Sequence, residues 1–166
     1  MRIFLSLTTI VIFLTTFTIF AGDGKVDFSG TWNFNEEKSE MGEGGRFMRM
    51  TKMVITQKDN DMTLERHSTR RDGEPFTMTD TLTLDGKECQ NPAFGENTKK
   101  STATWSENGK NLTINTTMEF WREGNKAEFT SVEVYKLSDD GKTLTVEYSG
   151  TSLRGERKAT YVYDKG

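Results

Sequence analysis

The sequence predicts an all-β protein that forms a single antiparallel up-and-down β-barrel of eight to ten strands. After residue 22, threonine, valine, isoleucine and aromatic residues alternate with polar residues, which is the period-two pattern of half-buried strands. Short polar turns separate these stretches, and several contain Asn-Gly or Asp-Gly, which favour tight hairpins. No long stretch carries an apolar stripe with the helical period of about 3.6 residues.

We expect strands near residues 26–34, 48–57, 62–70, 76–84, 99–106, 111–120, 128–138, 142–152 and 157–164. One helical turn is expected over 36–41, in the connection that follows the first strand. Strands joined by short turns pair as neighbours, and closing such a meander into a barrel removes its two exposed edges. A two-sheet sandwich is the alternative, but its crossovers need long connections, for which only 35–46 and 87–98 are candidates.

Residues 1–21 are interpreted as a signal peptide rather than as part of the fold. Arg2 supplies a positive start, residues 3–20 are apolar, and Ala21 is a small residue suited to cleavage. The alternative is an uncleaved membrane anchor, because the apolar run is nearly long enough to span a bilayer. Cleavage would leave one domain of ordinary size over 22–166, secreted or periplasmic and without a membrane span.

Charge and composition exclude several classes of function. The net charge of −3 becomes −4 once Arg2 is removed, so the chain offers no basic face for nucleic acid. Cys89 is the single cysteine and His67 the single histidine, too few for a zinc site of the usual ligands or for an internal disulfide. The sequence contains no nucleophile elbow, phosphate-binding loop or metal-ligand spacing. We therefore expect a protein that is not an enzyme, with no catalytic residues, metal or cofactor.

Cys89 is expected to be a small, partly buried thiol in a monomer. A disulfide-linked dimer is the alternative, because a leftover cysteine in an exported protein is able to pair between chains.

Alternation along two strands predicts which side chains share the interior face. Those of the fourth strand are Phe76, Met78, Asp80, Leu82 and Leu84, and those of the third are Met62, Leu64, Arg66 and Ser68. A hairpin register that pairs Arg70 with Phe76 would set Arg66 opposite Asp80 on the apolar side. We interpret this pair either as a partly wet ion pair near the barrel mouth or as a polar anchor for a ligand.

The last hairpin gives a second cluster. A register that joins Tyr148 to Tyr161 places two phenols together inside the barrel, either as core packing or as ligand contacts. The residues predicted to contact a ligand are thus Arg66, Met78, Asp80, Tyr148 and Tyr161.

Gly30-Thr31-Trp32 in the first strand fits the Gly-x-Trp signature of the calycin superfamily, which includes lipocalin-like and fatty-acid-binding-protein-like barrels. Residues 100–112 and 140–165 are similar to the middle and final hairpins of the latter, and the whole mature chain resembles secreted bacterial lipocalin-like proteins. The resemblance implies that Gly30 and Trp32 belong to a plug at one barrel end. It also implies a basic residue over the indole, for which Arg157 is chosen among Arg154, Arg157 and Lys158.

Two departures separate this chain from fatty-acid carriers. Tyr161-Val162-Tyr163 stands where that family has an Arg-x-Tyr that holds the ligand carboxylate, and 35–46 is too short for the family's helical lid. The resemblance implies interior binding of a small, mostly apolar or amphipathic ligand, with no carboxylate held in that manner. The competing hypothesis is a cell-envelope interaction module, such as a protease inhibitor or assembly factor. The barrel would then be a scaffold, with the methionine-rich stretch 41–53 as the contact surface.

Overall fold

Ten antiparallel strands follow one another along the part of the chain that this computed structural model describes, residues 24–42, 50–70, 72–122, 124–152 and 155–166. They are β1 (Gly30–Glu40), β2 (Met50–Lys58), β3 (Asp61–Thr69), β4 (Pro75–Thr83), β5 (Cys89–Pro92), β6 (Thr98–Trp105), β7 (Asn111–Arg122), β8 (Asn125–Leu137), β9 (Thr143–Ser152) and β10 (Gly155–Lys165). These ranges contain no helix, and so none that is able to cross a membrane. The signal peptide expected over 1–21 lies outside them.

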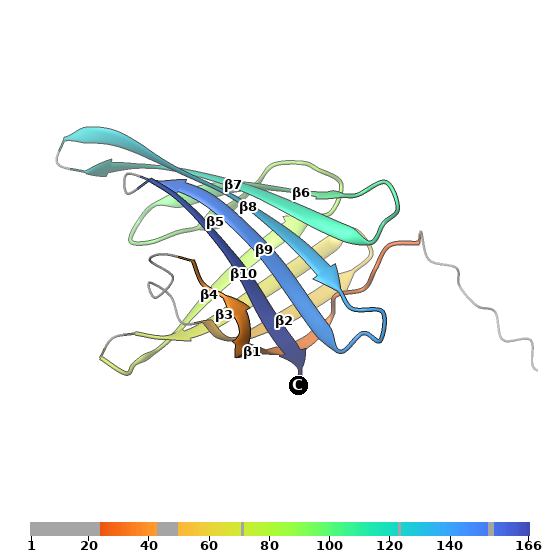
Figure 1. Cartoon of the computed structure of the whole chain (residues 1–166). Coiled ribbons are helices and arrows are strands. Elements are labelled where there is room, and N and C mark those ends of the chain that lie inside the picture. The colour runs from red at the N-terminus through yellow and green to blue at the C-terminus, as the bar shows by residue number, and fades with distance from the viewer. Residues whose placement is uncertain (1–23, 43–49, 71, 123, 153–154) are drawn as a thin grey trace, which may run out of the picture.

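The ten strands belong to one sheet, in the order β4-β3-β2-β1-β10-β9-β8-β7-β6-β5. Strands that are consecutive in sequence are neighbours in the sheet, except β4 and β5, and β1 pairs with β10. The sheet curls until its two edge strands approach each other, and Figure 1 shows the nearly closed barrel that results. The predicted up-and-down barrel is confirmed, and the sandwich alternative, which needs two stacked sheets, is wrong.

Side chains, rather than a backbone ladder, bridge the seam between β4 and β5. The buried Asn91 side chain accepts a hydrogen bond from the Thr81 N–H (2.8 Å) and donates one to the Thr81 carbonyl (3.0 Å). The Thr83 N–H donates to the sulfur of Cys89, a half-buried free thiol, at 3.3 Å. The predicted strands lack β5, because four residues that include Asn91 and Pro92 have almost no strand propensity.

The first strand begins later than predicted and continues to Glu40, so the helical turn expected over 36–41 is wrong. The strand has a bulge after Asn35, where the pairing with β10 shifts register. Within it the Ser39 hydroxyl donates to the Asn35 carbonyl at 2.6 Å, a contact between residues i and i+4 like that of a helical turn. The same hydroxyl accepts a hydrogen bond from the Val162 N–H of β10 at 2.9 Å. The serine side chain thus keeps the bulge attached to the sheet.

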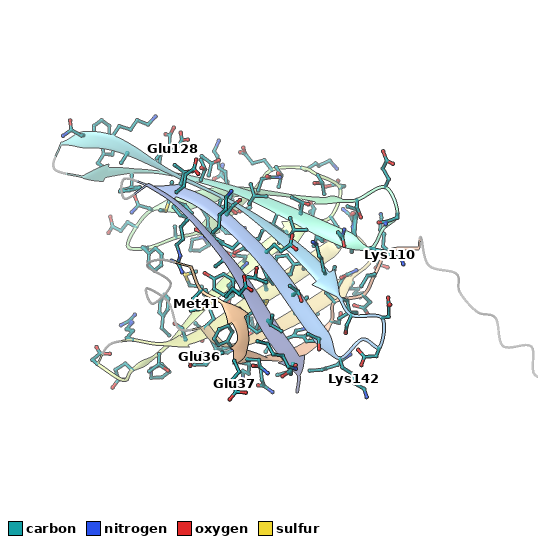
Figure 2. All side chains as sticks on the ribbon, in the orientation of Figure 1. Glu36, Glu37, Met41, Lys110, Glu128 and Lys142 are labelled. Carbon is teal, nitrogen blue, oxygen red and sulfur yellow. The ribbon has the colours of Figure 1, made fainter. Side chains whose placement is uncertain are left out.

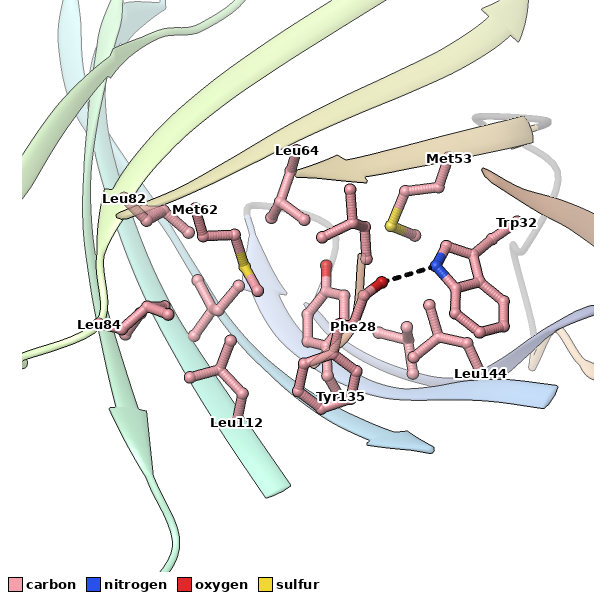
Figure 3. Packing of buried hydrophobic residues seen from close by; sticks show 14 of the residues in the cluster. Phe28, Trp32, Met53, Met62, Leu64, Leu82, Leu84, Leu112, Tyr135 and Leu144 are labelled. Atoms are coloured by element: carbon pink, nitrogen blue, oxygen red, sulfur yellow. Dashed lines mark hydrogen bonds between the residues drawn. The ribbon is translucent and has the colours of Figure 1, made fainter. Parts of the chain in front are cut away.

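Segment 24–29 and the start of β1 close one end of the barrel. Phe28 and Trp32 are fully buried there, and Figure 3 shows the hydrogen bond from the Trp32 indole N–H to the Phe28 carbonyl (2.9 Å). The Phe28 ring stacks on Trp105 with 5.8 Å between ring centroids. Gly30 turns the chain from the crossing segment into β1 with a φ of +145°, a conformation that side chains rarely permit. The plug therefore has two aromatic residues, of which the sequence pattern indicated one.

The basic residue over the indole is Lys165, and the choice of Arg157 is wrong. The Lys165 ammonium lies 5.4 Å from the centre of the Trp32 ring, and the two residues are cross-strand partners. Arg157 precedes Lys165 by eight residues of an extended strand, about 26 Å, which places it toward the opposite end of the barrel. Of the other candidates, Arg154 lies outside the described residues.

Buried apolar side chains fill the closed half of the barrel (Figure 3). Those at 1 % exposure or less include Phe28, Trp32, Met62, Leu64, Leu82, Leu112, Tyr135 and Leu144. Figure 2 shows that Lys110 and Lys142 lie in turns at this end, whereas Glu128 lies toward the other end, where the β7–β8 hairpin projects beyond the barrel. The packed core thus occupies one half of the interior and forms a floor for the other half.

Candidate ligand-binding site

The open half of the barrel holds a cavity of about 810 Å³. Its mouth is surrounded by the β3–β4, β5–β6, β7–β8 and β9–β10 hairpins, since alternate turns of a meander lie at the same end. Ligand sites occupy roughly 300–1,000 Å³, so the volume suits one small molecule. The apolar wall consists of Met50, Met53, Phe76, Met78, Leu82, Phe94, Ile114, Met118, Phe129 and Val146.

The predicted interior faces of β3 and β4 are confirmed, but the predicted register of their hairpin is wrong by two residues. Arg66 lies opposite Met78, whereas pairing Arg70 with Phe76 would have set Arg66 opposite Asp80. A shift of two residues leaves every side chain on its own face. Arg66 and Asp80 therefore still meet, as diagonal neighbours, and both are buried rather than partly wet.

Four charged side chains, from β3, β4, β6 and β8, form a cluster that crosses the interior between opposite sides of the barrel. Arg66 Nη1 bonds to the Asp80 carboxylate, and Arg66 Nη2 lies 2.7 Å from Glu133 Oε2. The Lys99 ammonium lies 2.7 Å and 2.8 Å from the two carboxylate oxygens of Asp80. The Tyr135 hydroxyl accepts from Arg66 Nη2 (2.8 Å) and donates to Glu133 (2.9 Å). Two cations thus face two carboxylates, and the formal charges of the cluster cancel.

Arg66 and Asp80 are the buried centre of the cluster, and each already has partners of opposite charge. The side chains of Arg66 and Asp80 are 8 % and 7 % exposed. Burial by itself would lower the pKa of the Arg66 guanidinium, but Glu133, Tyr135 and Asp80 raise that pKa well above its ordinary value. Burial also raises the pKa of Tyr135, which keeps its proton for the bond to Glu133. Arg66 is therefore a charged group with its counter-ions in place, and the ligand contacts expected of Arg66, Met78 and Asp80 stay predictions.

Tyr148 and Tyr161 line the same cavity from β9 and β10. The predicted register is again wrong by two residues, since Tyr148 lies opposite Ala159 and Tyr161 opposite Val146. Their rings are nevertheless neighbours, with 6.0 Å between centroids. Arg157 lies beside them: its guanidinium carbon is 5.8 Å from the centre of the Tyr148 ring, and its Nη2 donates to the Tyr161 hydroxyl at 3.0 Å. Ligand contact by the two tyrosines stays a prediction.

Glu133, Tyr135 and Lys99 belong to the charged cluster but are absent from the predicted site. For the strand predicted over 128–138, apolar residues occur on both faces, so alternation alone does not choose between them. Tyr135 is fully buried, whereas Val132 is 37 % exposed, so that the face with Glu133 and Tyr135 points inward. A buried glutamate is rare without a cationic partner. The contact between Glu133 and Arg66 joins residues 67 positions apart in the sequence, and alternation along one strand carries no signal of it.

Other predicted features lie away from the cavity or outside the described ranges. His67 projects from β3 on the face opposite to Arg66, with its Nδ1 3.1 Å from the Thr77 hydroxyl. Of the stretch 41–53, residues 43–49 are not described, whereas Met50 and Met53 line the cavity rather than an outer surface. Among the described residues, no three His, Cys, Asp or Glu side chains come together as metal ligands do.

The fold and the cavity together define an antiparallel up-and-down β-barrel, plugged at one end and hollow at the other. A similar solved structure is that of the zebrafish ileal bile acid-binding protein in complex with cholic acid. The two chains share 16 % sequence identity over 84 % of this chain and 98 % of that chain, with a TM-score of 0.53. At this identity the likeness establishes the fold. No family model and no curated protein matches the sequence.

Proposed function

We propose that the protein is an exported barrel that binds a small amphipathic molecule in its interior and performs no catalysis. The observation that carries this proposal is the cavity of about 810 Å³, with a mostly apolar wall and one fixed polar cluster. Such a wall buries the body of a ligand, and a few placed polar groups orient it. A calycin-like neighbour solved with cholic acid supports binding of this kind in a barrel of this shape.

The polar part of the wall favours uncharged hydrogen-bonding groups on the buried part of the ligand. Ser101 and Thr116 line the cavity with hydroxyl groups 2.9 Å apart, and Ser131 adds a third. The charged cluster accepts and donates hydrogen bonds but carries no net charge. A ligand hydroxyl or carbonyl therefore binds beside it without an unpaired charge, whereas a buried ligand anion would lack a counter-ion there.

Residues 1–21 support the proposal that the barrel is exported to the periplasm or out of the cell. We also propose that the barrel is a monomer. Each chain encloses its own cavity, so binding needs no second copy. Fractionation of cells that express the full chain tests export. Recovery of uncleaved protein in the membrane fraction would contradict it and support the membrane-anchor alternative.

A pair of adjacent substitutions tests interior binding. Ser131 lines the cavity, and Val132, the next residue of β8, projects outward. Ser131→Trp fills the cavity, so we expect it to abolish binding of the neutral dye N-phenyl-1-naphthylamine, which shares an apolar body with the proposed ligands. Val132→Trp adds the same ring outside and is expected to leave the affinity unchanged. Fluorescence titration measures both, and circular dichroism confirms that each variant is folded.

Equal binding of the dye by the two variants would contradict interior binding. If Ser131→Trp does not fold, Met78→Trp is the second cavity-filling variant, with Thr79→Trp on the outer face as its control. Native mass spectrometry of freshly purified protein complements the titration. A retained compound of amphipathic chemistry, lost in the cavity-filling variant, is the expected result.

A further inference from the structure

Three arginines line the cavity, and their surroundings differ. Arg66 is neutralised by Asp80 and Glu133, and Arg70 is exposed at the rim, where it lies 5.0 Å from the centre of the Phe76 ring. Within the described residues, Arg157 forms no ion pair, and its Nε is buried without a hydrogen-bond partner. A buried charged donor without a partner is unfavourable, because it has lost its hydrogen bonds to water. Arg157 is thus a half-buried lining cation that lacks a counter-ion.

A glycine opposite Arg157 leaves room for a tyrosine ring that contacts the guanidinium. Gly150 is the cross-strand partner of Arg157, and a Cβ at Gly150 would collide with the Tyr148 hydroxyl and ring. Because that space is empty of side chain, the Tyr148 ring extends across Gly150 and reaches the guanidinium. Tyr161, four residues after Arg157 on the same face of β10, accepts its hydrogen bond at 3.0 Å. Two phenols and one guanidinium therefore form a single patch of the wall.

This patch donates hydrogen bonds. Burial raises the pKa of Tyr148, to which Tyr161 also contributes, and burial raises the pKa of Tyr161, although Arg157 opposes both shifts. Both phenols consequently keep their protons at neutral pH. The Tyr161 hydroxyl accepts from Arg157 and still has its own proton to donate, and Arg157 offers Nε in addition. A cation beside neutral O–H donors complements a carboxylate or sulfonate group.

We propose that Arg157, with Tyr148 and Tyr161, forms an anion-binding site near the mouth of the cavity, which holds the acidic group of an amphipathic ligand. This inference rests on the proposed interior binding and adds the class and orientation of the ligand: an organic acid whose apolar body points toward the plugged end. A ligand anion deeper in the barrel would face the neutral cluster of Arg66, whereas near the mouth it gains an unpaired cation and stays close to water. Arg66 is then a structural residue, and Arg157 recognises the charge of the ligand.

Two dyes with the same skeleton test the proposal. N-phenyl-1-naphthylamine is neutral, and 8-anilinonaphthalene-1-sulfonate carries an anionic group on that skeleton. We expect Arg157→Gln to weaken binding of the sulfonate about tenfold, as the loss of a charge-assisted hydrogen bond does, and to change binding of the neutral dye less than twofold. Lys158→Gln is the matched control, because it removes the same charge from an exposed neighbour on the other face of β10. It is expected to change neither affinity.

The outcomes separate this inference from the proposed function. Unchanged sulfonate binding in Arg157→Gln would overturn the anion site, and so would an equal loss of both dyes, which would mean that Arg157 only shapes the wall. Failure of both dyes to bind the wild-type protein would overturn interior binding and this inference with it. Rising salt should weaken the sulfonate complex of the wild type and leave that of Arg157→Gln nearly unchanged.

Discussion

At the residue scale, two arginines that line the cavity differ in their partners. Arg66 has counter-ions, whereas Arg157 forms no ion pair among the described residues. Arg66 and Lys99 face Asp80 and Glu133 in a group that has no formal net charge. Removing one partner from such a buried group costs more than the group contributes, because the remaining charges lose their counter-ion. The cluster therefore joins β3 and β4 to β8 across the interior, and substitutions within it should affect stability before they affect ligand affinity.

Arg66→Met provides the test. The change leaves two carboxylates in the interior with Lys99 as the remaining cation of the cluster, and we expect the free energy of unfolding to fall by about 3 kcal/mol. Chemical denaturation measures this loss. Arg70→Met, which removes an exposed arginine just beyond β3, should change stability by less than about 0.5 kcal/mol. The double variant Arg66→Met/Glu133→Gln should regain part of the loss, and a single-variant loss below about 1 kcal/mol would contradict the structural role.

At the element scale, the weak point of the barrel is the seam between β4 and β5. Every other neighbouring pair of strands in the sheet forms a backbone ladder, whereas here Asn91 and Cys89 use side chains to bond the backbone of Thr81 and Thr83. The Asn91 amide presents one of its N–H groups and its oxygen side by side to the backbone of Thr81, so it replaces one rung of a ladder. The seam thus closes without the length of strand that a full ladder would need.

Asn91→Leu tests the seam. Leucine keeps the size of the side chain but leaves the N–H and carbonyl of Thr81 without partners, so we expect a loss of about 1–3 kcal/mol in the free energy of unfolding. The Thr81 amide should also exchange its hydrogen faster, which nuclear magnetic resonance records. Gln90→Leu alters the exposed neighbour in β5 and should have little effect on either quantity. Equal effects of the two substitutions would show that Asn91 does not hold the seam.

At the scale of the whole molecule, alternation predicted the barrel and the inward faces of β3, β4 and the last hairpin, but not the inward face of β8. Two hairpin registers were each wrong by two residues, and the interior residues stayed correct because such a shift preserves the face. The short strand β5 and the partner Glu133 were beyond prediction, since both depend on contacts between distant parts of the chain. The resemblance placed Arg157 at the plug. The eight extended residues between Arg157 and Lys165, the partner of Trp32, set it too far from the plugged end.

The two ends of the barrel differ in packing. Ligand binding should therefore reduce local opening at the mouth more than at the plugged end. The closed end is sealed by Phe28 and Trp32 over a filled core, whereas the hairpins at the mouth surround an unfilled space. Local opening is easiest where few buried contacts resist it. Saturation with a ligand at about 100 times its dissociation constant adds roughly 2.7 kcal/mol to the free energy of unfolding.

Hydrogen exchange followed by mass spectrometry distinguishes the two ends. With the neutral naphthylamine dye bound, we expect slower exchange in the β3–β4 and β7–β8 hairpins, because the dye replaces the contacts that these hairpins lack. The β6–β7 and β8–β9 turns at the plugged end should change little. Ser131→Trp should remove the difference between dye-free and dye-bound protein. A ligand in the hollow half contacts the hairpins of the mouth rather than the turns at the plugged end. Protection confined to the plugged end, or spread evenly over both ends, would therefore mean that the ligand does not occupy the hollow half.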